Sequence, residues 1–240
     1  MFHNDSLAFL DMIKNQKALH NDGDKPKIAV TDAAGNKIAV NDTASDKIAA
    51  NDTEIDKLRI AVIDTETNWH DQVMSIGIAF ADAVTYKCID KSYYIFKDES
   101  RVGGMFSNVL RSCDVLPVIL GRSEAMRAIR EELQSRGIRK IFAYNAKFDY
   151  GHLPEISDFE WYDIMRLAAY RQYNHAIPDT APCCKTGRLK SDYGVEPITR
   201  MLSGDMGYFE IHNAVRDAED ELRIMELLGL ALEKYECAKL

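Results

Sequence analysis

Two acidic residues stand two positions apart at the end of an apolar run. Segment 58–63 is rich in β-branched side chains, and Asp64 and Glu66 follow it, separated by Thr65. Side chains two apart lie on one face of a strand, so the two carboxylates are expected to point the same way. Neighbouring carboxylates repel each other, and the pKa of one of them rises unless a cation lies between them. This pair is therefore a candidate divalent-cation site.

Two further acids and a histidine complete the candidate set. Asp149 follows a second apolar run, 140–144, and strand ends of one sheet can lie side by side, so Asp149 can join the first pair. His212 and Asp217 lie five residues apart, a separation that places helical side chains about 140° apart. They can approach one site from different directions if His212 lies just before the helix.

Each of these residues, taken alone, also has an ordinary structural explanation. Asp64 can be a turn residue at a strand end, and Asp217 can be a favourable charge at a helix N-terminus. His212 can be a cap or a partly buried structural histidine. The ordered set is more specific than any single member.

The segments that carry these residues show two kinds of apolar spacing, one typical of strands and one typical of helices. Strands are predicted at 58–63, 73–80, 85–97 and 140–144. Helices are predicted at 123–136, ending at Gly137, and near 162–173, 195–202 and 212–232. Strands followed by a helix, a strand and more helices predict an α/β fold with a mixed central sheet flanked by helices.

The N-terminal part of the chain has a different pattern. Residues 17–56 repeat with a period of ten, and the clearest copies begin at Lys27, Lys37 and Lys47. A helical arm, short β-strands and a disordered segment all remain open for these repeats. The composition is typical of a spacer or a self-association arm. We therefore expect an N-terminal extension over 1–56 and a catalytic domain over 57–240.

Composition limits the class of protein. The 240 residues carry a net charge of −8, which excludes a broad basic face as the main means of holding nucleic acid. No run of 18 apolar residues is present, so we expect no membrane span. The first 20 residues lack the apolar core of a secretory signal. Five cysteines without a CxxC pair favour a reducing compartment, and we expect the cytoplasm.

The ordered acids and histidine resemble the DEDDh 3′–5′ exonucleases, a family that includes the proofreading subunit of bacterial replicative polymerases, ribonuclease T and oligoribonuclease. Segment 63–67 is similar to the first motif of that family, 145–149 to the second and 212–217 to the third. The resemblance covers about residues 57–235 and implies an RNase H-like sheet. The loop 174–191 departs from the family pattern.

The resemblance implies a metal-dependent mechanism. Asp64, Glu66, Asp149 and Asp217 would hold two Mg²⁺ or Mn²⁺ ions, since carboxylate oxygens suit these cations. His212 would be the general base that takes a proton from the attacking water. The products would be nucleoside 5′-monophosphates released from a nucleic acid 3′ end.

The substrate and the partners are less constrained than the chemistry. We expect DNA, as single strands or frayed ends. An exoribonuclease that processes RNA 3′ ends is one alternative, and a nucleic-acid or protein interaction module with the same fold is another. The repeats are a candidate for self-association, and whether a polymerase partner exists stays open.

Residues within and beside the motifs are candidates for substrate contact. We expect Thr67, Asn145, Lys147 and Phe148 to contact substrate. For Phe148 core packing is favoured over base stacking, whereas for Trp69 the two are equally supported. Further candidates for phosphate contact are Lys185, Arg188, Lys190 and Arg216. We assign structural roles to His70 and His152 and an ordinary loop role to Cys183 and Cys184.

Overall fold

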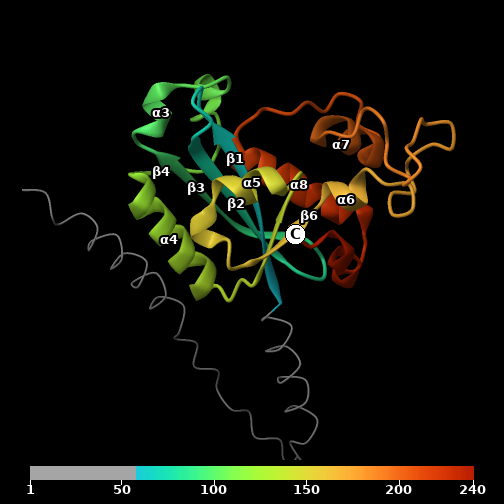
Figure 1. The fold of residues 1–240 in the computed structure, drawn as a ribbon, viewed down its shortest axis with the longest axis horizontal. Coiled ribbons are helices and arrows are strands. Elements are labelled where there is room, and N and C mark those ends of the chain that lie inside the picture. Colours follow the sequence, from blue (N-terminus) through green and yellow to red (C-terminus); the bar gives the residue numbers. More distant parts are fainter. Residues whose placement is uncertain (1–57) are drawn as a thin grey trace, which may run out of the picture. The chain divides into compact units, whose positions relative to one another are not determined.

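A computed structural model describes residues 58–240 of the chain (Figure 1). The decapeptide repeats and the expected 1–56 extension lie outside the described residues. The expected start of the catalytic domain, residue 57, lies just outside them as well.

A six-stranded sheet of order β4-β3-β2-β1-β5-β6 forms the centre of the described part (Figure 1). The strands are β1 (Arg59–Thr67), β2 (Val73–Asp82), β3 (Cys88–Phe96), β4 (Val118–Leu120), β5 (Lys140–Ala143) and β6 (Glu160–Asp163). β1, β2 and β3 pair antiparallel, whereas β4, β5 and β6 join their neighbours in parallel. The predicted mixed α/β sheet is therefore confirmed.

Helices cover both faces of this sheet because its central strands are apolar on both sides. One face of β1, carrying Ala61 and Ile63, packs with the buried side of α4 (Arg122–Ser135). The other face, carrying Ile60 and Val62, packs with α8 (Ala214–Leu228). Helix α7 (Val195–Ser203) adds Val195 and Ile198 to the same cluster.

Short elements connect the main ones. They are α3 (Glu99–Val102), η1 (Ser107–Val109), α5 (Lys147–His152), η2 (Pro154–Ile156), α6 (Met165–Ala168) and η3 (Leu232–Ala238). Helix α5 follows β5 directly, and α6 follows β6. Both of these helices therefore begin at the carboxyl ends of strands that run parallel to β1.

The helix predicted near 162–173 is wrong in its first part. Residues Glu160–Asp163 form β6, which pairs in parallel with β5, and helix α6 is only four residues long. The aromatic side chains of Trp161 and Tyr162 are buried in the two apolar layers of the sheet. Sheet pairing thus overrides the helical spacing of this segment.

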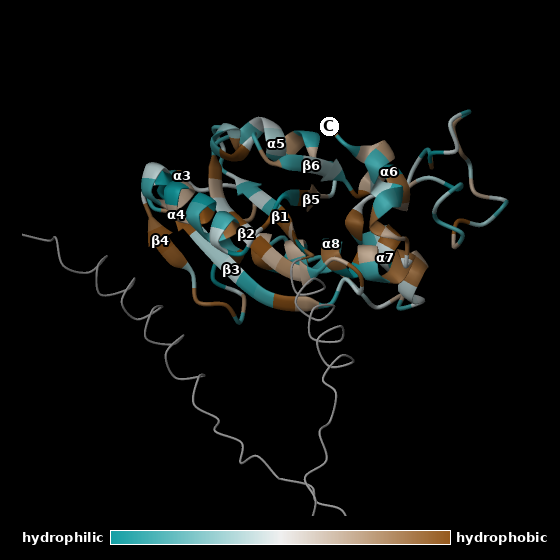
Figure 2. Cartoon of the chain, turned by 90° about the horizontal axis from the view of Figure 1, so that it is seen from below, coloured by the Kyte–Doolittle hydropathy of each residue, from teal (hydrophilic) through white to brown (hydrophobic). Residues whose placement is uncertain are grey.

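Two other differences concern β4 and the ends of α8. The edge strand β4 was not predicted, because its three residues are too short to show periodicity; it is strongly hydrophobic in Figure 2. Helix α8 begins at Ala214 and ends at Leu228, inside the predicted 212–232. It stops because Gly229 adopts a left-handed conformation, with a φ of 59°.

A glycine in β2 sets the distance between α8 and the sheet. A Cβ atom at Gly77 would lie 2.1 Å from the backbone carbonyl of Ala214, at the start of α8. Gly77 is also the register partner of Asp64 on β1. The missing side chain therefore lets the N-terminus of α8 lie directly beside the first acidic motif.

Within residues 58–240, none of the helices is long and apolar enough to cross a membrane.

Candidate metal centre

Three of the predicted residues meet at one point. Single ligand atoms of Glu66, His212 and Asp217 lie within 4.8 Å of one another. Glu66 comes from the end of β1, His212 from the segment just before α8, and Asp217 from the first turn of that helix. Both carboxyl side chains are buried, whereas the histidine is half-buried. Two carboxylates and an imidazole at this spacing can hold a divalent cation.

Asp64 lies on the same face of β1, next to this group. Its Oδ2 atom is buried and has no hydrogen-bond partner among the described residues. Burial raises the pKa of Asp64, and the nearby carboxylates of Glu221, Asp217, Asp149 and Glu66 raise it further. The four predicted acids therefore share one electrostatic environment.

Asp149 is fixed to β1 by a hydrogen bond. It is buried in α5, and its Oδ1 accepts a hydrogen bond of 2.7 Å from the Thr65 hydroxyl. Burial raises the pKa of Asp149 to about 7, although the bond from Thr65 acts in the opposite direction. Thr65, which separates the two acids of the first motif, thus connects β1 to the second motif.

The pKa values of the other two predicted acids, Glu66 and Asp217, are raised as well. Burial raises the pKa of Glu66 to about 8, and the carboxylates of Glu210 and Asp149 add to the effect. Burial raises the pKa of Asp217 to about 9, and the carboxylates of Glu210 and Glu66 add to the effect. The Asp217 Oδ1 atom is buried without a hydrogen-bond partner in the described residues. Buried, unpaired carboxylate oxygens facing one another are the donor set that a divalent cation requires, so these residues fit such an ion.

The ring of His212 stacks on an aromatic side chain, and its backbone has a left-handed conformation. Its ring lies on that of Phe106, with 4.1 Å between the centroids and 22° between the planes. Its φ is 61°, a conformation that non-glycine residues adopt mainly at constrained sites. Burial lowers the pKa of His212, whereas the carboxylate of Glu196 raises it. The neutral imidazole, the form that can accept a proton, is therefore favoured.

Two acids of this site were missed by the sequence analysis. Glu221 is buried on α8, and burial together with the Asp149 carboxylate raises its pKa. Glu210 lies 3.9 Å from His212, measured from Oε1 to Nδ1, and burial raises its pKa to about 7. The i,i+4 spacing from Asp217 was a signal for Glu221, since residues four apart share a helix face.

The predicted substrate contacts lie around the acids. Thr67 ends β1 and is half-buried, whereas Asn145, Lys147 and Phe148 are exposed at the start of α5. Asn145 has a φ of 62°, and its N–H donates to Asp163 Oδ1 at 3.1 Å. Asn145 in the second motif and His212 in the third thus both have a left-handed backbone conformation.

The expectation that Phe148 packs in the core is wrong. Its side chain is 40% exposed, because the short helix α5 buries Asp149 and turns the preceding position outward. The ring of Phe148 lies 4.4 Å from that of His152. His152 in turn contacts Asp71 through Nε2 at 3.2 Å. Trp69, in the same turn as Asp71, is 66% exposed. Two aromatic side chains are therefore available next to the first two motifs.

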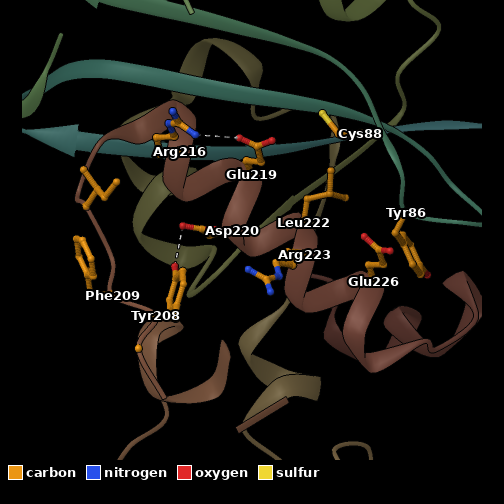
Figure 3. Close-up of a pocket in the computed structure, with 12 residues that line it drawn as sticks. Tyr86, Cys88, Tyr208, Phe209, Arg216, Glu219, Asp220, Leu222, Arg223 and Glu226 are labelled. Carbon is orange, nitrogen blue, oxygen red and sulfur yellow. Dashed lines mark hydrogen bonds and ion pairs between the residues drawn. The ribbon is translucent and has the colours of Figure 1, made fainter. Parts of the chain in front are cut away.

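Arg216, one of the predicted phosphate contacts, forms ion pairs with acidic side chains. Arg216 lies 3.3 Å from Asp114 and 4.0 Å from Glu219. It lines a groove of about 500 Å³ along α8, in which Tyr208 also donates a hydrogen bond to Asp220 (Figure 3). This groove contains none of the predicted metal ligands. The charge of Arg216 is therefore already compensated.

The other basic candidates lie in a small turn. Cys183 and Leu189 form an antiparallel bridge, which brings Lys185 and Lys190 to the surface. The guanidinium of Arg188 lies 5.1 Å from the ring centroid of Tyr193. The half-buried Cys183 packs against the core cluster of the α8 face, as an ordinary loop residue does.

Solved structures share this fold at low sequence identity. No family model and no curated protein matches the chain. E. coli exonuclease I in complex with a dA16 oligonucleotide has a TM-score of 0.51 and 13% identity, over 74% of this chain and 42% of that one. A zinc-bound form of the E. coli exonuclease I–ssDNA complex has a TM-score of 0.50 and 13% identity, over 71% of this chain and 40% of that one.

A third similar structure involves RNA. The structure on 3′-end-specific recognition of the histone mRNA stem-loop by a 3′-exonuclease has a TM-score of 0.53 and 11% identity, over 80% of this chain and 71% of that one. The chain spans less than half the length of E. coli exonuclease I. At these identities the likeness shows a shared fold.

Proposed function

We propose that the chain is a 3′–5′ exonuclease that depends on two Mg²⁺ or Mn²⁺ ions and releases nucleoside 5′-monophosphates. The observation that carries the proposal is the convergence of Glu66, His212 and Asp217, with Asp64 and Asp149 beside them. The fold shared with exonuclease structures supports it, as does the resemblance of the three motifs to DEDDh exonucleases.

The four predicted acids have the role of ion ligands in this proposal. Asp64, Glu66, Asp149 and Asp217 would hold two cations, which supply charge compensation in the transition state and activate water. Thr65 keeps Asp149 beside β1 through its 2.7 Å hydrogen bond. The close contact at Gly77 keeps Asp217 beside the same strand. Without cations the buried acids repel one another, which favours ion binding.

His212 has the role of general base. It accepts a proton from the attacking water, and the stack on Phe106 holds the ring in place while it does so. Burial keeps the pKa of His212 below its ordinary value, so the ring is ready to accept a proton near neutral pH.

Exposed side chains beside the acids would hold the strand. Phe148 and Trp69 are available to stack on bases near the 3′ end, and Lys147 is available for a phosphate. Thr67 and Asn145 would position the terminal nucleotide from the ends of β1 and β5. A few terminal contacts of this kind suit a chain with net charge −8, because the ions neutralise the acids that would repel phosphate.

We propose single-stranded or frayed DNA as the substrate and the cytoplasm as the location. The similar exonuclease I structures hold single-stranded DNA, and the five cysteines of this chain are all unpaired. The domain over 57–240 would carry the activity, with the repeats as an arm for self-association.

The test compares 5′-labelled single-stranded DNA, duplex DNA and RNA of one sequence, each with Mg²⁺, Mn²⁺ or EDTA. The proposal predicts metal-dependent shortening from the 3′ end, fastest on single-stranded DNA. Faster degradation of RNA would replace the proposed substrate and leave the reaction type intact. Internal cleavage, or cleavage that persists in EDTA, would overturn the proposed mechanism.

A further inference from the structure

Glu221, on α8, lies where this helix meets the ends of β1 and β5. β1 and β5 pair in parallel, with Val62 opposite Phe142. Tyr144 directly follows Ala143, the last residue of β5, and the charge of Glu221 acts on Asp64 at the neighbouring end of β1. The backbone N–H of Tyr144 donates a buried hydrogen bond of 2.9 Å to Glu221 Oε2. The carboxyl group of Glu221 therefore lies at the carboxyl end of β5, beside Asp64.

Helix geometry directs Glu221 into the site. Asp217 and Glu221 are four apart on α8 and so occupy the same helix face, one turn from each other. Only 2% of Glu221 is exposed. A carboxyl group buried this deeply is costly unless a hydrogen bond, a cation or a proton compensates it. Its nearest electrostatic neighbours include Asp149 and Asp217, which add to that cost.

Basic side chains do not compensate Glu221. None of the ion pairs within 58–240 includes it. Its neighbours on α8 differ from it, because Glu219 pairs with Lys91 at 3.0 Å and Asp220 accepts a hydrogen bond from Tyr208 at 2.7 Å. Glu221 is almost completely buried, accepts one hydrogen bond from a backbone N–H, and lies near Asp64. The unpartnered Asp64 Oδ2 and Asp217 Oδ1 atoms are independent signs that this interior lacks a positive charge.

We propose that Glu221 is a positioning residue of the cation site. Its hydrogen bond to Tyr144 fixes α8, which carries Asp217, against the end of β5, from which α5 and Asp149 follow. Its carboxylate joins those of the four predicted ligands and strengthens the attraction for divalent cations. This inference rests on the proposed metal-dependent function and deepens it.

Two substitutions separate the roles of charge and hydrogen bond. Glu221→Gln keeps the shape and an oxygen that can accept from Tyr144, but it removes the charge. Glu221→Leu removes both. The matched control is Glu219→Gln, which removes a charge from a surface ion pair on the same helix.

The experiment measures Mn²⁺ binding to the full chain by calorimetry, without nucleic acid, together with thermal unfolding in EDTA. Glu221→Gln should weaken Mn²⁺ binding about tenfold, which corresponds to about 1.4 kcal/mol, while Glu219→Gln leaves it within about twofold. Glu221→Gln should unfold at the wild-type temperature or above, since a like charge is removed from the interior. Glu221→Leu should also lower the unfolding temperature, because the Tyr144 N–H loses its acceptor.

Three results would overturn the inference, and they are distinguishable. Wild-type affinity for Mn²⁺ in Glu221→Gln would remove Glu221 from the site and leave the proposed function standing. Equal loss of affinity in Glu221→Gln and Glu219→Gln would show a general charge effect. Absence of Mn²⁺ binding by the wild-type chain would overturn both the inference and the proposed function.

Discussion

At the scale of single residues, the site is a cluster of buried and half-buried carboxyl groups. Asp64, Glu66, Asp149 and Asp217 all have raised pKa values, and burial is the largest cause for each of them. Residues that serve stability alone are rarely arranged in this way, because each buried carboxyl group costs free energy without a partner. Strongly raised pKa values in one cluster are typical of catalytic or ion-binding sites.

His212 allows a sharp prediction at this scale. His212→Ala should lower turnover about 10²- to 10⁴-fold, because the proposed general base is lost. In the wild-type chain at saturating Mn²⁺, turnover should fall as pH drops through the pKa of His212, since the protonated ring cannot accept a proton. Burial lowers that pKa, so the fall should lie below the ordinary value of about 6.5.

The check is a pH–rate profile under single-turnover conditions. The acidic limb should disappear in His212→Ala while Mn²⁺ affinity changes little. A variant that keeps the same limb, or that loses less than about tenfold in rate, would contradict the role of His212 as base.

Motif spacing singled out Glu66, His212 and Asp217, and the structure brings one ligand atom of each within 4.8 Å of the others. The surroundings of these residues were harder to predict. The sequence did not predict Glu221, because an acid in an acidic helix looks like a solvated face until burial is known. It misplaced Phe148 in the core, since α5 is too short to show which of its sides is buried.

At the scale of elements, the contact between α8 and β2 positions the third motif against the first. A Cβ atom at Gly77 would lie 2.1 to 2.2 Å from backbone atoms of Ala214 and Val215. Backbone cannot yield as a flexible side chain can, so α8 would have to move. Asp217 lies in the first turn of that helix and would move with it.

Gly77→Ala should therefore cost about 1–3 kcal/mol of stability and most of the proposed exonuclease activity. Urea unfolding and a nuclease assay measure the two effects. Gly151→Ala in α5 is the matched control for stability, because a Cβ there meets no heavy atom within 4 Å. Unchanged stability of Gly77→Ala would show that α8 does not depend on this contact.

Strand prediction succeeded at this scale where apolar runs were long, and it failed where pairing decided the structure. The apolar runs at 58–63, 73–80 and 140–144 overlap β1, β2 and β5, respectively. β4 and β6 have three and four residues and exist through pairing with β3 and β5. Periodicity cannot show an element whose stability comes from a distant partner.

At the scale of the whole molecule, the acidic site makes stability depend on pH and cations together. The pKa values of Glu66 and Asp217 rise to about 8 and about 9 in the folded state. An acid with a raised folded-state pKa favours folding at low pH, and this contribution is lost as pH rises through the folded pKa. In EDTA, the unfolding temperature should therefore fall between about pH 5 and pH 9.

Divalent cations should reverse this loss, because they bind the ionised carboxylates of the folded chain and not the unfolded chain. Thermal unfolding across that pH range, with EDTA or with Mg²⁺, measures the effect. Parallel curves under the two conditions would mean that the buried acids do not bind Mg²⁺.

The division of the chain gives a further prediction at this scale. A truncated chain that starts at Asp56 should keep its activity on short single strands, because every predicted ligand lies after residue 57. If the repeats mediate self-association, light scattering should give a smaller oligomer for the truncated chain than for the full chain. A folded but inactive truncated chain would contradict the proposed catalytic domain.

The central claim is that this acidic site hydrolyses nucleic acid from the 3′ end with divalent cations. The most direct measurement follows mononucleotide release from single-stranded DNA, labelled at the phosphate of its 3′-terminal nucleotide, by the wild-type chain and by Asp217→Asn. The wild-type chain should release nucleoside 5′-monophosphates with Mg²⁺ or Mn²⁺. Release should fall at least a hundredfold in Asp217→Asn and should be absent in EDTA. Wild-type release by Asp217→Asn, or no release by the folded wild-type chain with either cation, would contradict the central claim.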